Sequence, residues 1–209
     1  KRLYLIGGFL AFLISFIVYA MTVQVTTSFW DCGEFISTSY TLGVPHPPGA
    51  SLMQLTYRLA GILPIPGEVA YHVNLASAFF NSLGIGLLFI IIAKVITRWF
   101  IKVKDFTDIS IVFSGAAVGA LLAAFSSTYW FNSVEAEVYG PAMFLTNLVV
   151  LLSIIWSEHH NNVRSDRYLV LIAIVFYLAI SVHLTVLIML PPLFLFFIIV
   201  DKTNRKDPL

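Results

Sequence analysis

The acidic residues of this 209-residue chain fall into two groups with different neighbours. Six stand beside lysine or arginine and have the pattern of ordinary solvated charges: Asp105, Asp108, Glu158, Asp166, Asp201 and Asp207. The other five share Arg58 as their one local cation: Asp31, Glu34, Glu68, Glu135 and Glu137. Carboxylates without cationic partners are costly to desolvate, so the second group is where we look for chemistry.

Asp31 and Glu34 lie in the segment FWDCGEF, residues 29–35. Their i, i+3 spacing places them on one face of a helix. They could form a capping box, with Asp31 as N-cap and Glu34 reaching back. Alternatively, a carboxylate here could act as a general base that takes a proton from a hydroxyl as it attacks an activated sugar. The two interpretations are compatible.

A rigid tetrapeptide, His46-Pro47-Pro48-Gly49, follows. Pro47 favours an extended His46, and Gly49 allows a close backbone approach. It could simply turn the loop back toward the membrane. In the alternative, His46 donates a hydrogen bond to a phosphate or a sugar hydroxyl.

Two further segments are candidates for binding. In residues 130–139, helical geometry would place Glu135 and Tyr139 on one face with Glu137 pointing away. Such a pair of carboxylates near aromatic rings suits a sugar or a divalent cation, although a solvated interfacial segment is the alternative. His183 is either a core histidine or part of the same site. The single cysteine gives no metal-ligand spacing, and we predict no metal centre.

The elements that position these residues are predicted to be membrane helices. Hydrophobic residues make up 59% of the chain and charged residues 11%, and the mean hydropathy is +0.90. A soluble domain of this size could not bury so much apolar surface, so lipid must cover much of it. The net charge of +1 gives no indication of nucleic-acid binding.

We expect about six transmembrane helices, in one all-α polytopic bundle covering residues 1–209, because a bilayer core needs roughly 20 apolar residues per helix. Four spans are predicted near 3–21, 69–93, 109–127 and 141–157. The 33-residue run 168–200 is too long for one span, and Ser181, His183 and Thr185 at its middle favour two short helices with a turn at His183.

The loop charges support this topology. With a cytoplasmic amino terminus, every Lys and Arg except Arg58 lies on the cytoplasmic side. The opposite side then carries loop 22–68, loop 128–140 and the His183 turn. Within the first of these, 33–42 and 49–62 are predicted to form short interfacial helices.

Two patterns predict how the helices pack. Gly115-x-x-x-Gly119 on the third span should allow another helix to approach closely. Asn74, Ser77 and Asn81 form a polar face on the second span, which we expect to point toward other helices. His72, His159 and His160 are assigned no functional role.

Four motifs resemble, in the same order, a bacterial membrane family whose eukaryotic relatives include a transmembrane protein O-mannosyltransferase. They are FWDCGEFI at 29–36, GVPHPPGA at 43–50, VEAEVY at 134–139 and SVHLT at 181–185. The two motifs in the long loop are specific, whereas the other two would be weak alone.

The resemblance implies the amino-terminal part of a GT-C-type glycosyltransferase in the bacterial inner membrane, with its active-site loops periplasmic. It implies a polyprenyl-phosphate sugar donor, with mannose as the sugar, and hydroxyl groups of exported proteins as acceptors. By the same resemblance, Asp31 is the base and Glu34 its orienting partner. The residues that contact sugar or phosphate would be His46, Arg58, Glu135, Glu137, Tyr139 and His183. No cofactor is certain, and a divalent cation remains open.

Two other classes of function stay open. A transporter or lipid flippase would favour charges buried mid-span and two related halves, and neither pattern is seen. A non-catalytic subunit of a larger membrane complex would tolerate replacement of Asp31 by Asn.

Overall fold

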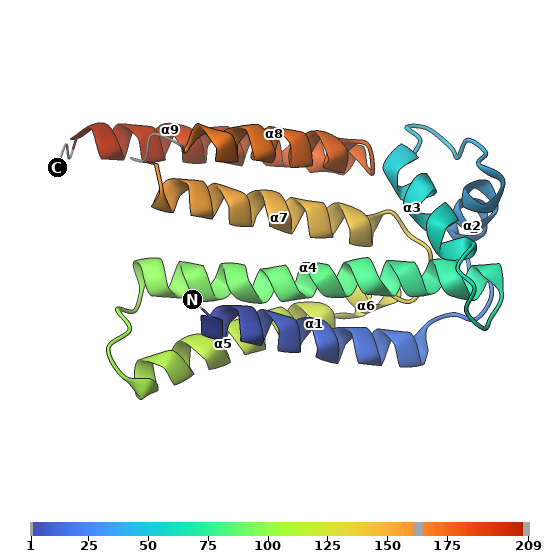
Figure 1. Ribbon diagram of the computed structural model, residues 1–209, viewed down its shortest axis with the longest axis horizontal. Coiled ribbons are helices and arrows are strands. Elements are labelled where there is room, and N and C mark those ends of the chain that lie inside the picture. Colours follow the sequence, from blue (N-terminus) through green and yellow to red (C-terminus); the bar gives the residue numbers. More distant parts are fainter. Residues whose placement is uncertain (1, 161–164, 207–209) are drawn as a thin grey trace.

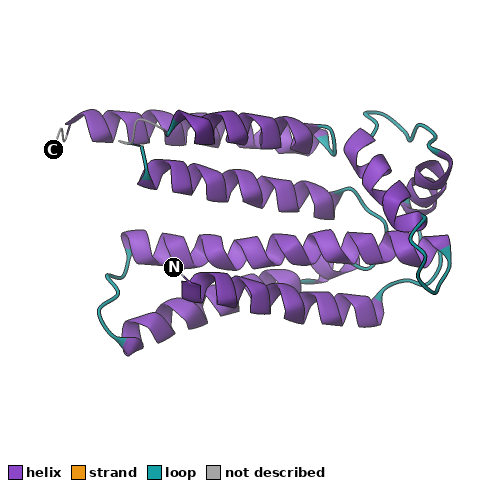
Figure 2. Ribbon diagram, viewed as in Figure 1, coloured by secondary structure: helices purple, strands orange, loops and turns teal. Residues whose placement is uncertain are grey.

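The computed structural model describes residues 2–160 and 165–206, and within these ranges every regular element is a helix (Figures 1 and 2). The predicted all-α bundle is therefore confirmed. The elements in chain order are α1 (Arg2–Thr22), α2 (Cys32–Thr41), α3 (Ser51–Gly61), α4 (Val69–Trp99), α5 (Phe106–Ala124), α6 (Ser127–Phe131), α7 (Tyr139–Glu158), α8 (Asp166–Ile180), the 3-10 helix η1 (Leu184–Met189) and α9 (Leu190–Lys206).

Five helical segments of the described chain are long and apolar enough to cross a membrane. They are Arg2–Thr22, Val69–Trp99, Phe106–Ala124, Tyr139–Glu158 and Leu184–Asp201. The remaining predicted span, the first half of the run 168–200, corresponds to α8. This helix has only 15 residues and is therefore about 22 Å long. This is shorter than a typical hydrocarbon core of about 30 Å.

The predicted turn at His183 is confirmed. Helix α8 ends at Ile180, and the chain then reverses direction, so that α9 runs antiparallel to α8 (Figure 1). Apolar residues of α7, α8 and α9 meet in one buried cluster that includes Val149, Trp156 and Val175.

Apart from Arg58 of α3, the basic residues in the described part of the chain lie toward one end of the bundle, as the loop charges predict. The amino terminus, the α4–α5 connection and the carboxyl terminus all lie toward this end (Figure 1). Lys94 of α4 forms an ion pair there with Glu158 at the end of α7, with Nζ–Oε1 2.8 Å. We call this the basic end, and the opposite end, which carries α2, α3 and the 181–183 turn, the site end.

Glycines set the spacing of the helices around α4. A Cβ built on Gly8 of α1 would lie 2.9 Å from the Gly86 carbonyl oxygen of α4, so these two backbones touch. On the other side, Gly115 and Gly119 of α5 face Ile96 and Ile92 of α4, which confirms the predicted close approach.

The polar face of α4 points inward, as predicted. The Asn74 amide donates to the Gln24 carbonyl at 2.8 Å, and the Asn81 amide donates to the Asn132 carbonyl at 3.3 Å. The Ser77 hydroxyl also donates to the Asn132 carbonyl, at 3.3 Å. These bonds tie α4 to the two connections that carry the candidate acids.

One local prediction is wrong. Residues 132–138 are not helical, because α6 ends at Phe131 and α7 begins at Tyr139. The Gln24 amide donates to the Val134 carbonyl at 2.9 Å, so tertiary hydrogen bonds replace helical ones in this connection. Glu135 and Tyr139 therefore do not share a helix face.

Candidate functional site

The candidate site is a small cleft at the site end, formed by three connections that are distant in sequence. Asp31 precedes α2, His46 lies between α2 and α3, Glu137 and Tyr139 lie at the start of α7, and His183 follows α8. All five residues line the same cavity, whose volume is about 40 Å³. The fold thus brings together acids and histidines separated by up to about 150 positions.

Asp31, Glu34 and His46 form the exposed part of the site. One ligand atom from each lies within 4.8 Å of the other two. The His46 Nδ1 is 2.9 Å from Glu34 Oε2, and its Nε2 is 4.0 Å from Asp31 Oδ2. The side chains of Asp31 and His46 are about half exposed, so a substrate could reach both.

The capping-box interpretation of Asp31 and Glu34 is wrong. Asp31 is the N-cap residue of α2, but its side chain makes no capping hydrogen bond. Glu34 turns away from the helix start and accepts hydrogen bonds from the backbone and ring nitrogens of His46. Both carboxylates are therefore directed at the loop that carries His46.

The loop after α2 positions His46. The His46 carbonyl accepts a hydrogen bond from the Gly49 amide at 2.9 Å, which closes a turn. Gly49 has φ +78°, a conformation that favours glycine, and nothing lies within 4 Å of a Cβ built there. Gly49 therefore serves the turn rather than a close backbone approach. The imidazole also packs on the Phe35 ring, with centroids 5.7 Å apart.

Glu137 lies on the inner side of the cleft and is 6% exposed. The Tyr57 hydroxyl of α3 donates to the Glu137 carbonyl at 2.8 Å, which anchors the backbone at this point. The 132–138 connection is irregular, and of its two acids only Glu137 lines the cavity, whereas Glu135 is bonded to Ser28.

The turn after α8 contributes His183, whose ring lies against Tyr139 with centroids 5.3 Å apart. Its Nδ1 is 2.7 Å from the Thr185 hydroxyl oxygen. This contact orients the imidazole on the wall opposite the Asp31 loop.

Two residues predicted to bind substrate lie outside the cleft lining. Glu135 is 2% exposed and accepts a hydrogen bond from the Ser28 hydroxyl. The Arg58 guanidinium donates to the Tyr40 carbonyl and lies over the Tyr40 ring, 5.0 Å from its centroid. Arg58 therefore ties α3 to α2, and its geometry gives it no part in the cleft.

The charges of the cleft perturb one another. The hydrogen bond that the His46 ring donates to the Glu34 carboxylate raises the pKa of His46 above its usual value. The same bond lowers the pKa of Glu34. Burial, together with the nearby Glu135 and Asp31 carboxylates, raises the pKa of Glu137 to about 7. Burial also raises the pKa of Glu135 and lowers that of His183. The cleft therefore combines exposed carboxylates, an imidazole whose protonated form Glu34 favours, and a Glu137 that can take up or release a proton near neutral pH.

The exposed triad has a donor set that fits a divalent cation. Two carboxylates and an imidazole suit Mn²⁺ or Zn²⁺, and their spacing is close enough for shared coordination. Binding an ion would require His46 and Glu34 to give up their mutual hydrogen bond. The expectation of no metal centre stays a prediction.

Several residues that shape the site were not identified from the sequence. Ser28 and Tyr57 hold the 134–138 connection through Glu135 and the Glu137 carbonyl, and Phe35 supports His46. Nothing local in the sequence indicates the bonds made by Ser28 and Tyr57, since their partners are about 107 and 80 positions away.

The described residues define a polytopic α-helical integral membrane protein with a carboxylate–imidazole cleft at the end opposite its basic residues. The chain belongs to the family described as the Protein O-mannosyl-transferase TMEM260 N-terminal domain, whose model matches residues 31–206. It is 30% identical over 145 residues to the mouse Protein O-mannosyl-transferase TMEM260, an alignment that covers 68% of this chain and 18% of the mouse protein. No solved structure matches the chain.

Proposed function

We propose that this chain forms the catalytic region of a membrane glycosyltransferase of the GT-C type. The reaction would transfer a hexose from a polyprenyl-phosphate donor to hydroxyl groups of exported proteins, and the similarity to the mouse O-mannosyl-transferase favours mannose. The observation that carries the proposal is the convergence of Asp31, Glu34, His46 and Glu137 at the site end, opposite the basic end of the bundle. The positive-inside bias would place that end on the outer, periplasmic face of a bacterial inner membrane, with the amino terminus cytoplasmic.

The exposure and spacing of the cleft side chains support a role for each. Asp31 is exposed and carries the carboxylate that takes the proton from the acceptor hydroxyl as its oxygen bonds to the anomeric carbon. The bond between that carbon and the phosphate oxygen breaks, and the electron pair leaves with the polyprenyl phosphate. The Glu34 carboxylate raises the pKa of His46 and so favours the imidazolium form, which can stabilise the phosphate charge. Glu34 fixes the ring orientation, with Nδ1 engaged and Nε2 left toward Asp31.

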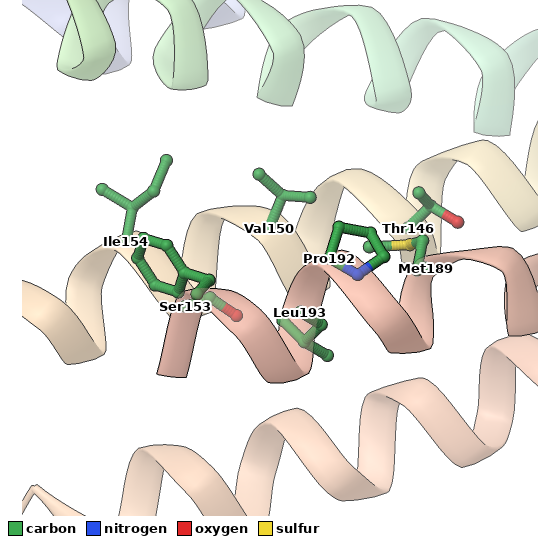
Figure 3. Close-up of a pocket in the computed structure, with 8 residues that line it drawn as sticks. Thr146, Val150, Ser153, Ile154, Met189, Pro192 and Leu193 are labelled. Atoms are coloured by element: carbon green, nitrogen blue, oxygen red, sulfur yellow. The ribbon is translucent and has the colours of Figure 1, made fainter. Parts of the chain in front are cut away.

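An apolar groove would suit the lipid part of such a donor. Between α7 and α9 lies a cavity of about 360 Å³ whose residues, shown in Figure 3, are nearly all apolar. Figure 3 shows Val150 and Ile154 on α7 and Pro192 and Leu193 on α9 among the residues that line it. The hydroxyl of Ser153 is already bonded to the Val149 carbonyl at 2.8 Å, so the groove offers little to a polar ligand.

The proposal is tested by transfer assays on membranes that contain the full-length protein. Separate radiolabelled donors would be polyprenyl-phosphate mannose, polyprenyl-phosphate glucose and a nucleotide-linked mannose. The expected result is label in secreted protein from a polyprenyl-phosphate donor only, released by alkaline β-elimination as expected for a Ser or Thr linkage. Movement of labelled donor across sealed vesicles without any transfer to protein would contradict the proposal and favour a flippase.

A further inference from the structure

A second, larger cavity adjoins the carboxylate cleft. Its volume is about 480 Å³, and it lies where α4, α6 and the start of α7 meet. The residues that line it and carry polar groups are Asn81, Ser126, Thr128, Tyr129, Asn132 and Tyr139. Tyr139 lines both this cavity and the cleft, so the two spaces meet at this residue.

Size separates the two spaces. The cleft, at about 40 Å³, has room for only a few water molecules. Small-molecule sites are usually several hundred cubic ångströms, and the second cavity is in that range. A hexose that reacts beside Asp31 therefore needs a place to bind outside the cleft, and the adjoining cavity is large enough.

The lining favours a neutral, hydroxyl-rich ligand. It presents hydroxyl and amide groups with two tyrosine rings, and none of the described lining residues is lysine or arginine. A phosphate would therefore find no cation here, whereas a sugar ring could use the hydroxyls and stack on a tyrosine. The walls are braced, because the Tyr129 hydroxyl donates to the Asn81 carbonyl at 3.1 Å and the Asn132 amide donates to the Thr128 carbonyl at 2.8 Å.

Depth favours the donor over the acceptor. Asn81 lies 12 residues into α4, about 18 Å along the helix from Val69, and Met143 lies one turn into α7 from Tyr139. The cavity is thus on the membrane side of Tyr139. A sugar attached to a membrane lipid would arrive from that side, and a protein acceptor would arrive from water.

We propose that this cavity binds the sugar ring of the lipid-linked donor, an inference that rests on the proposed transferase function. Asn132 and Thr128 would hydrogen-bond sugar hydroxyls, and Tyr139 would contact the sugar where the cavity meets the Asp31 cleft, with the anomeric carbon toward Asp31. Thr128 and Ser126 are exposed, so the cavity opens to an incoming ligand.

Kinetics give the first test. In the full-length protein, Thr128→Val should raise the donor KM about 3- to 10-fold, as expected for one lost hydrogen bond, and leave the acceptor KM unchanged. Thr128→Ser keeps the hydroxyl and should therefore have the donor KM of the wild type. Thr107 is an exposed threonine at the basic end, so Thr107→Val is the matched control and should leave the donor KM unchanged. A rise in acceptor KM alone, or no change in either, overturns the inference.

A binding test separates this inference from the proposed reaction. The probe is a long-chain alkyl mannoside with a photoreactive diazirine on the sugar, and an alkyl phosphate of equal chain length carrying the same group serves as comparison. Mannoside crosslinks should map within 126–143, be competed by unlabelled alkyl mannoside, and weaken in Thr128→Val. Such labelling without any transfer activity would defeat the proposed reaction but keep the sugar site. Crosslinks elsewhere, or equal labelling of 126–143 by the phosphate, would overturn the sugar site whatever the transfer assay shows.

Discussion

Glu34 and His46 are joined twice, through the backbone amide and through the ring Nδ1 of the histidine. The two residues are 12 positions apart, and the loop containing three prolines brings them together. Because Nδ1 is engaged, Nε2 is the ring atom left to face Asp31 and the cleft. The pair therefore sets both the orientation and the charge of the imidazole.

The first prediction concerns that charge. In Glu34→Gln the amide keeps the shape of the side chain but loses its negative charge, so the pKa of His46 should fall toward its usual value. If transfer needs the imidazolium, the alkaline limb of the pH profile of kcat/KM moves to lower pH. Parallel histidine NMR titrations would report the same shift directly. An alkaline limb that stays in place would exclude His46 as the cation.

The second prediction concerns stability and Glu137. Its pKa is raised from the usual 4.5 to about 7 in the folded protein, so folding favours the protonated form. The stabilisation is complete below about 4.5 and is lost as pH rises through about 7, a change of roughly 1–3 kcal/mol in the free energy of unfolding. The Tm of the wild type should therefore fall between pH 4.5 and 7, and in Glu137→Gln this fall should disappear.

The exposed Glu68 provides the control for that measurement. Glu68→Gln should keep the pH dependence of the wild type, since Glu68 lies at the start of α4 and does not line the cleft. An equal fall in Tm in all three proteins would show that another group is responsible.

The third prediction concerns the contact between α4 and α7. A Cβ on Gly140 would lie 1.8 Å from the Asn81 side-chain nitrogen, so Gly140→Ala must displace this amide from its bonds to the Ser77 and Asn132 carbonyls. We expect a loss of about 1–3 kcal/mol, measured as a lower Tm in detergent. Gly33→Ala is the matched control, because its Cβ would have its nearest neighbour at 3.8 Å. Equal Tm values for the two variants would contradict this packing.

The fourth prediction separates Arg58 from the cleft. Arg58→Met should lower Tm slightly, through loss of its contacts with Tyr40, and leave the donor KM within about twofold. His46→Gln should instead reduce turnover by about tenfold or more, because it removes a charge at the reacting end. A large rise in donor KM in Arg58→Met, at unchanged Tm, would show that Arg58 reaches the substrate.

The helices were predictable because lipid imposes a simple rule on long apolar runs. The predicted spans at 3–21, 69–93 and 141–157 begin within two residues of the observed helices. The end of α4 was missed by six residues, since Lys94 and Arg98 extend the helix beyond its apolar part. The charge pattern also predicted the reversal at His183, because only a hairpin returns the 202–206 cations to the basic end.

The sequence identified most residues of the site but not how they are arranged. The charge pattern and the motifs singled out Asp31, Glu34, His46, Glu137 and His183, and the fold places them together. Local rules failed at 132–138, where bonds from Gln24 and Tyr57 override the helical spacing. Single-sequence patterns do not encode such distant partners.

Arg58 is a second case in which the sequence did not reveal the partner of a side chain. The loop charges predict it as the one cation on its side of the membrane, which made it the natural partner for an anionic substrate. The structure gives it a nearer partner in Tyr40, 18 positions away. Charge counting identifies a cation but does not show whether its donors are already used.

The central claim is that Asp31 is the base of a transferase. Its most direct test is the initial rate of mannosyl transfer from polyprenyl-phosphate mannose, with the full-length wild type, Asp31→Asn and Glu68→Gln at equal abundance in membranes. Removing a general base should slow transfer by about 100-fold or more in Asp31→Asn, while Glu68→Gln stays within about twofold of the wild type. Transfer by Asp31→Asn at the rate of the wild type would contradict the account and leave the proton to another carboxylate.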